Sequence, residues 1–117
     1  MNKKDELMRV NFLLKHINLV ENDVKDKTLE QFGKSDLQVR ATSFSLMQIG
    51  EQMNKLEQHF RDSYPDIPWA DARSMRNIIV HVYAKIDVEQ VYKTATTDIQ
   101  ELKQAFHKIK QDLTKSL

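Results

Sequence analysis

Four side chains able to take part in acid–base or phosphate chemistry fall within one run of eight residues, RNIIVHVY at positions 76–83. Arg76 carries a permanent positive charge and a planar fork of N–H donors that fits phosphate oxygens. The imidazole of His81 ordinarily titrates near neutral pH, so it can exchange protons there. Together they suit chemistry at a phosphate ester, and Asn77 and Tyr83 add an amide and a phenol as hydrogen-bonding groups.

The run is better explained as a helix than as a strand. In a strand, Ile78, Val80 and Val82 would share one face, and β-branched residues favour sheets, but the chain offers no second convincing strand to pair with it. On a helix, at about 100° per residue, the aliphatic side chains gather on one side and the four polar ones occupy the opposite arc, with only Val80 intruding. That arc is either the solvated half of a surface helix or a site for a phosphate ester.

The first half of the chain predicts two of the helices that must position this run. Only two Gly and two Pro occur in 117 residues, and long segments repeat apolar residues every three or four positions, which is typical of amphipathic helices. We expect the polar tract 30–35, with Gly33, to be a helix end and a loop, and a second helix to cover about 36–60. The first helix is predicted by the stripe Leu7, Val10, Leu13, Leu14, Ile17, Val20 and Val24.

The second half predicts two more helices. The segment SYPDIPW at 63–69 breaks the apolar pattern, and Pro68 suits the first turn of a third helix running from about Trp69 into the run. Asp87 and Gln90 resemble a capping box that opens the last helix. Four helices with short connections predict an all-α fold, an antiparallel up-and-down bundle of four to five helices. The last helix is predicted by the stripe Val88, Val91, Tyr92, Ala95, Ile99, Leu102, Phe106, Ile109 and Leu113.

Size and charge limit the kinds of function that fit. A chain of 117 residues with 40% hydrophobic and 30% charged residues is typical of a soluble globular protein, and we expect one domain over residues 1–117. It is large enough for one core but not for a deep internal cavity, so a site should lie on a surface or an interface. The net charge of +1 supplies no global field, and a polyanion must therefore be held by a local patch.

The sequence argues against disulfide-linked, metal-binding and membrane-spanning proteins. The chain has no Cys, which excludes disulfides and thiolate metal sites and fits a reducing compartment. His16, His59 and His107 lie far apart without metal-ligand spacing, so we expect no metal and no cofactor. Charge or Asn interrupts every apolar run near the N-terminus, and no later segment approaches a membrane span. We therefore expect a cytoplasmic protein with no membrane partner.

Short segments on both sides of the run extend its pattern. The run together with these segments resembles the HEPN superfamily, specifically its HepT branch of bacterial toxin–antitoxin proteins, over about Arg40 to Tyr92. The flanking helices match only in pattern, and Gln52 and Tyr92 stand where Ala and Trp are more usual, although neither touches the run. The matching segments are Arg40-Ala41, IGE at 49–51, Lys55-Leu56, YPDIPW at 64–69, MRN at 75–77, and Ile86-Asp87 followed by Val91.

The resemblance implies a HEPN-like bundle that forms a homodimer, brings two copies of the run into one cleft, and acts as a metal-independent endoribonuclease. By that analogy His81 is general base or acid at the ribose 2′-hydroxyl, and Arg76 stabilises charge on the phosphorane-like transition state. RNA is the implied substrate because only RNA carries that hydroxyl. Tyr83 would contact RNA or accept AMP from a cognate nucleotidyltransferase-fold antitoxin.

Two supporting residues keep two interpretations each. Asn77 would orient a neighbour or hold the helix by hydrogen bonds, and it is equally well explained as an ordinary helix-face amide. Glu51 can reach the helix that carries the run and orient Arg76, although a solvated or capping carboxylate is the simpler interpretation. Gly50, beside it in mid-helix, costs about 1 kcal/mol against Ala, which predicts close helix packing at that point.

Two rival functions remain open from the sequence. The chain fits a non-catalytic helical binding partner of a nucleotidyltransferase, in which the same cleft docks a nucleotide or the partner chain. It also fits a degenerate structural dimer, although intact Arg76, His81 and Tyr83 argue against decay. Trp69 and Tyr64 are better explained as a core plug or dimer contact than as a platform for base stacking.

Overall fold

The computed structural model describes residues 1–80 and 86–117, apart from the side chains of Ile79 and Val80. His81 and Tyr83 therefore lie outside the described residues. The described residues are helical and contain no strand, which confirms the all-α prediction. The elements are α1 (Lys3–Val24), α2 (Leu29–Gly33), α3 (Asp36–Phe60), α4 (Ala70–Val80), α5 (Val88–Lys93), the π-helical segment η2 (Thr94–Asp98) and α6 (Ile99–Lys115).

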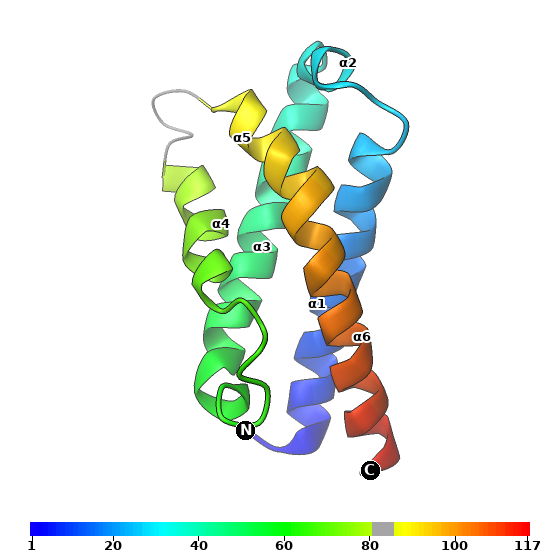
Figure 1. The fold of residues 1–117 in the computed structure, drawn as a ribbon, viewed down its shortest axis with the longest axis vertical. Helices are drawn as coiled ribbons and strands as arrows, with labels where there is room; N and C mark the ends of the chain where they lie inside the picture. Colours follow the sequence, from blue (N-terminus) through cyan, green and yellow to red (C-terminus); the bar gives the residue numbers. More distant parts are fainter. Residues whose placement is uncertain (81–85) are drawn as a thin grey trace.

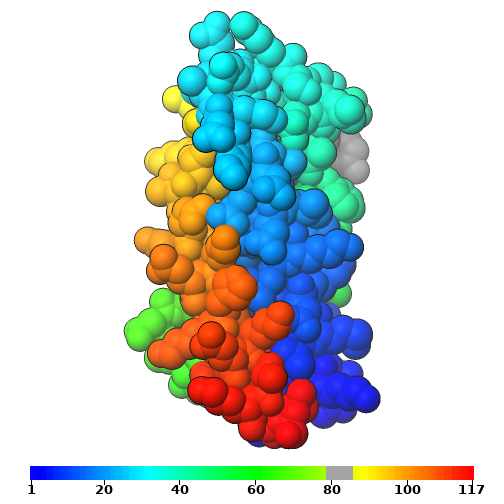
Figure 2. All heavy atoms as spheres, turned by 90° about the vertical axis from the view of Figure 1, so that its right-hand side faces the viewer, coloured from blue at the N-terminus to red at the C-terminus, as the bar shows by residue number. Residues whose placement is uncertain are grey.

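The long helices form an up-and-down bundle, as predicted. In Figure 1, α1 and α4 run in one direction along the long axis, and α3 and the continuous α5–η2–α6 helix run in the other. Figure 2 shows α1 in blue and α6 in orange to red lying side by side along the molecule. Of the helices in the described ranges, none is long and apolar enough to cross a membrane.

The predicted apolar stripes form the core. From Val10 to Val24 every position of the α1 stripe is buried, while Leu7 is partly buried against it. In the long stripe of the last helix, every residue from Val91 onward is buried except Tyr92, which is partly buried. The buried side chains of all the long helices form one cluster. Hydrophobic burial along these stripes thus accounts for the bundle.

Side-chain caps fix where the helices begin. The Asn2 side chain accepts a hydrogen bond from the Asp5 backbone N–H at 2.8 Å, and Ser35 Oγ accepts one from Gln38 N–H at 3.1 Å. Each satisfies a backbone donor that has no partner within the first helical turn. The predicted start of α3 at 36 and its end at 60 are confirmed.

The prediction of a helix end and a loop at 30–35 is confirmed for the end at Gly33 and for residues 34–35, but the helix that ends there is a separate short one. Thr28 and Gln31 form a reciprocal capping box that opens the short helix α2, which ends at Gly33. Phe32, in the middle of this helix, is fully buried. One buried aromatic and a good cap suffice for a single turn of helix, whereas a five-residue helix is too short to show a periodic stripe.

The helix α4 begins at Ala70, one residue after the expected start at about Trp69. Pro68 precedes the helix rather than occupying its first turn, and its carbonyl oxygen accepts from the Asp71 N–H at 2.9 Å. Pro68 has no N–H to donate, so it loses nothing at this position.

The last helix is not α-helical throughout. Asp87 caps α5 through the Gln90 N–H at 3.1 Å, as predicted. The helix then widens at Thr94–Asp98, where the Ile99 N–H reaches the Thr94 carbonyl five residues back. The stripe advances by four residues at each step from Val91 through Ala95 to Ile99, and these three residues stay buried through the π turn.

Candidate functional site

The candidate site begins where α3 and α4 make their closest approach. A Cβ atom at Gly50 would lie 2.8 Å from the Ala72 carbonyl oxygen, 3.0 Å from Arg76 Cγ and 3.2 Å from the Arg76 backbone nitrogen. Only a residue without a side chain fits between two backbones at that separation. The predicted close packing at Gly50 is confirmed, and this packing sets the position of Arg76 relative to α3.

The next residue of α3 holds the arginine. Arg76 Nε donates to Glu51 Oε1 at 2.7 Å, a short charge-assisted contact between two helices. The two side chains keep 43% and 38% of their exposure, so the pair lies at the surface and not in the core. The contact uses Nε of the guanidinium. The ion pair therefore fixes Nε, and the terminal nitrogens have no hydrogen-bond partner among the described residues.

Arg76 also lines a groove between the end of α3 and the start of α4. The groove encloses about 670 Å³ and is floored by the two-proline connection between the helices. From α3 it takes Asn54, Glu57 and Arg61, and from α4 it takes Arg73 and Arg76. A surface groove beside Arg76 agrees with the expectation that the site does not lie in an internal cavity.

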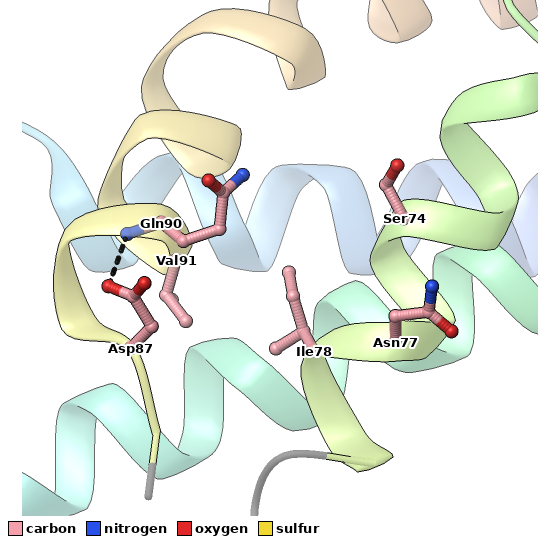
Figure 3. Close-up of a pocket in the computed structure, with 6 residues that line it drawn as sticks. All are labelled: Ser74, Asn77, Ile78, Asp87, Gln90 and Val91. Carbon is pink, nitrogen blue, oxygen red and sulfur yellow. Dashed lines mark hydrogen bonds between the residues drawn. The ribbon is translucent and has the colours of Figure 1, made fainter.

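Asn77 points elsewhere. Its side chain lines a smaller hollow of about 350 Å³ between α4 and α5, together with Ser74, Ile78 and Gln90. Figure 3 shows Ser74 and Asn77 on α4 across from Gln90, with the dashed bond marking the Asp87 cap of α5. Among the described residues the Asn77 amide makes no side-chain hydrogen bond. It is therefore not seen to orient a neighbour or to hold the helix. The structure brings Glu51 and Arg76 together and places Asn77 in a different hollow.

Trp69 and Tyr64 serve the core, as expected. The Trp69 side chain is 8% exposed, donates from Nε1 to the Tyr64 carbonyl oxygen at 3.1 Å, and meets Phe106 edge-on with ring centroids 6.2 Å apart. The Tyr64 hydroxyl donates to Asp112 at 3.2 Å on α6. Burial, followed by Asp112 and Glu6, raises the pKa of that phenol. The Trp69 ring is therefore committed to the core, and the Tyr64 ring is partly buried against it.

Sequence reasoning did not single out Arg61 and Arg73. Arg73 lies one turn before Arg76, so their i, i+3 spacing on the predicted helix was a usable signal. Arg61 joins them only because the 61–69 connection folds the end of α3 back beside α4, and nothing in the periodicity predicts that turn.

Comparison with known proteins defines the class. The model of the family described as "Ribonuclease HepT-like" matches residues 13–109. The Methanocaldococcus jannaschii protein named "Putative RNase MJ0125" is 32% identical over 113 residues, which are 97% of this chain and 97% of that protein. "Probable ribonuclease HepT" of Thermococcus cleftensis is 30% identical over 99 residues, 81% of this chain and 86% of that protein. No solved structure gives a significant match.

A longer relative also matches. "Gamma-glutamylcyclotransferase and putative RNase MJ0434" of Methanocaldococcus jannaschii is 32% identical over 114 residues. Those residues are 97% of this chain, and the chain spans about half, 51%, of that relative.

The chain belongs to the HepT-like ribonuclease family, a class of RNA-hydrolysing enzymes. The family match covers α4, which carries Arg76, and the helices before and after it. The predicted resemblance to HepT proteins is confirmed.

Proposed function

We propose that residues 1–117 form one domain that cuts RNA internally without a metal, using Arg76 and His81. The observation that carries this is the Arg76–Glu51 contact of 2.7 Å, whose arginine lines a surface groove. A buried structural ion pair would show both groups desolvated, whereas this pair is exposed at 43% and 38%. An arginine that is held in place and still exposed suits the binding of a phosphate.

In the proposed reaction the ribose 2′-oxygen attacks the adjacent phosphorus while the bond from phosphorus to the 5′-oxygen breaks. One proton leaves the 2′-hydroxyl and another reaches the departing 5′-oxygen, the work assigned to His81. Negative charge gathers on the non-bridging oxygens, where Arg76 stabilises it. The products are a 2′,3′-cyclic phosphate end and a 5′-hydroxyl end.

Two copies of the chain are proposed to complete the cleft. A single copy carries a net charge of only +1, so pairing two local basic clusters gives a stronger site for a polyanion. Arg76 and Asn77 are exposed on α4 and thus accessible to a second copy. A monomer by light scattering at micromolar concentration would contradict this part of the proposal.

The decisive experiment is RNA end mapping with the purified chain, Arg76→Ala and His81→Ala. Both substitutions should lower kcat by about 100-fold or more and leave the thermal melt unchanged. Cleavage should persist in EDTA. Arg40→Ala is the matched control, because Arg40 is an exposed arginine of α3 that is paired with Asp36 away from the groove. Wild-type chain that cuts no RNA would favour the non-catalytic binding partner instead, and cleavage restored only by magnesium would exclude the metal-free mechanism.

We also propose that the chain is a toxin whose partner is a nucleotidyltransferase-fold antitoxin, with Tyr83 as acceptor of AMP. An attached adenylate would place a phosphate where the substrate phosphate binds and would occupy the Arg76 fork. Co-expression with the neighbouring nucleotidyltransferase should add mass in AMP units, and Tyr83→Phe should abolish the addition. An unmodified chain that is still neutralised would mean inhibition by occlusion.

A further inference from the structure

We infer that the groove between the end of α3 and the start of α4 holds the RNA phosphates next to the scissile one, with Arg73 and Arg61 as its phosphate-binding residues. The inference rests on the proposed function and extends it, because it assigns residues that bind substrate away from the reacting bond.

Three arginines line the groove. Arg73 and Arg76 lie one turn apart on α4, and both line the groove. Across from them, the lining runs from Asn54 and Glu57 on α3 to Arg61, the residue that follows the helix, over about 10 Å at 1.5 Å per residue. The groove thus places Arg61, from the end of α3, opposite the two arginines of α4.

Around the groove, positive side chains outnumber negative ones. Three arginines line it against one acid, Glu57, while the entire chain has a net charge of +1. Glu57 contacts Arg61 at 3.3 Å, an exposed pair of the weak i, i+4 kind. The Arg61 side chain keeps 69% of its exposure and Arg73 is also exposed. With Glu51, which pairs with Arg76, the three arginines face two carboxylates, so the local excess is one positive charge.

The floor of the groove indicates how RNA would be read. Pro65, Ile67 and Pro68 line it beside Trp69, whose ring is committed to the core. With no free aromatic among these lining residues, bases have no stacking platform. Binding should therefore depend on phosphate contacts, tolerate different sequences and weaken steeply with salt.

The test is the salt dependence of binding to a short single-stranded 2′-O-methyl RNA, which lacks the nucleophile and is not cut. Each lost phosphate contact should reduce the slope of log K against log salt by about 0.7. Arg73→Gln and Arg61→Gln should each show that reduction, and the double variant about twice as much. Arg73→Lys, which keeps the charge, and Arg40→Gln, away from the groove, should keep the wild-type slope. Thermal melts of all variants should match the wild type, because these side chains are exposed.

Cleavage kinetics separate this inference from the proposed function. Arg73→Gln should raise KM and leave kcat unchanged, because it removes binding that is uniform in the ground and transition states. If Arg73→Gln and Arg61→Gln leave the salt dependence of RNA binding unchanged in a chain that still cuts RNA, the assignment of the groove to RNA binding is overturned. The proposed function would remain intact. Arg73→Gln and Arg61→Gln variants that lose nucleotidyltransferase binding but keep RNA binding would also overturn the inference. Binding with the expected slopes but no cleavage would instead contradict the proposed function.

Discussion

The contact between α1 and α6 and the contact between α3 and α4 hold their helices by different means. Along α1 and α6, large aliphatic and aromatic side chains interdigitate, and Leu13, Ile17, Leu102 and Phe106 are all fully buried. At the crossing of α3 and α4, Gly50 places one backbone against another, and an exposed ion pair lies beside it. The first contact is made by fully buried apolar side chains, whereas the second also sets the position of Arg76.

The difference separates stability from positioning. Side chains in an apolar stripe can repack around a changed neighbour at a limited cost. Two backbones in contact have no side chain to adjust, so any added atom moves a whole helix. We therefore expect substitutions in the two regions to act on different measurements, and the following predictions run from the largest effect to the smallest.

Phe106→Ala should lower the free energy of unfolding by about 3–5 kcal/mol, because it opens a cavity beneath Trp69 in the α1–α6 region. The loss is measured by chemical denaturation. Cleavage per folded molecule should be unchanged at temperatures where the variant is folded. Phe44→Ala is the control, because Phe44 is 54% exposed and its loss should cost less than about 1 kcal/mol. If folded Phe106→Ala instead loses kcat, the α1–α6 region also affects the site, which would contradict the separation of stability from positioning.

Gly50→Ala should destabilise by about 1–3 kcal/mol through overpacking, although Ala is the better helix former. Its Cβ would meet the Ala72 carbonyl oxygen at 2.8 Å, so α4 must move and Arg76 with it. Both the unfolding free energy and kcat should fall. Gly33→Ala is the matched control, because its Cβ would meet only the Val88 side chain at 3.3 Å. A Gly50→Ala chain with wild-type stability and cleavage would show that the crossing tolerates a shift.

Glu51→Gln should reduce kcat by about two- to fivefold with little change in stability, because an exposed pair contributes at most about 1 kcal/mol. The amide keeps the size of the carboxylate but loses its charge, so Arg76 is held less firmly. Steady-state kinetics and a thermal melt provide the measurements. Glu57→Gln, which breaks the neighbouring pair with Arg61, should leave kcat unchanged. If Glu51→Gln and the wild type have equal kinetics, Glu51 is only a solvated carboxylate and does not orient Arg76.

Asp71→Asn should raise the melting temperature slightly at pH 7. Burial, followed by repulsion from Asp98 and Glu101, raises the pKa of the Asp71 carboxyl in the folded chain. The folded state therefore binds the proton more tightly than the unfolded state does. Stability from this group is present below its ordinary pKa and is lost as pH rises through the folded value. The advantage of Asn should thus shrink as pH falls toward 4, and an advantage that grows on acidification would contradict this assignment.

Much of the bundle and part of the site could be predicted from the sequence because both depend on helical period. Apolar spacing placed α1, α3 and the last helix, and an isolated mid-helix Gly50 indicated the close crossing. The π turn could not be predicted, since it preserves the buried stripe. Nor could α2, which depends on one capping box and one aromatic. The arginine groove depends on how the 61–69 connection turns, which no periodic pattern encodes.

The glycine contact also bears on how new specificities would arise in this scaffold. A position where two backbones touch offers directed evolution almost no neutral steps, because the first substitution already displaces Arg76. Arg61 and Arg73, by contrast, are exposed and can be exchanged one at a time without disturbing the helices. A library built to retarget this protein should therefore diversify the groove and keep Gly50 invariant.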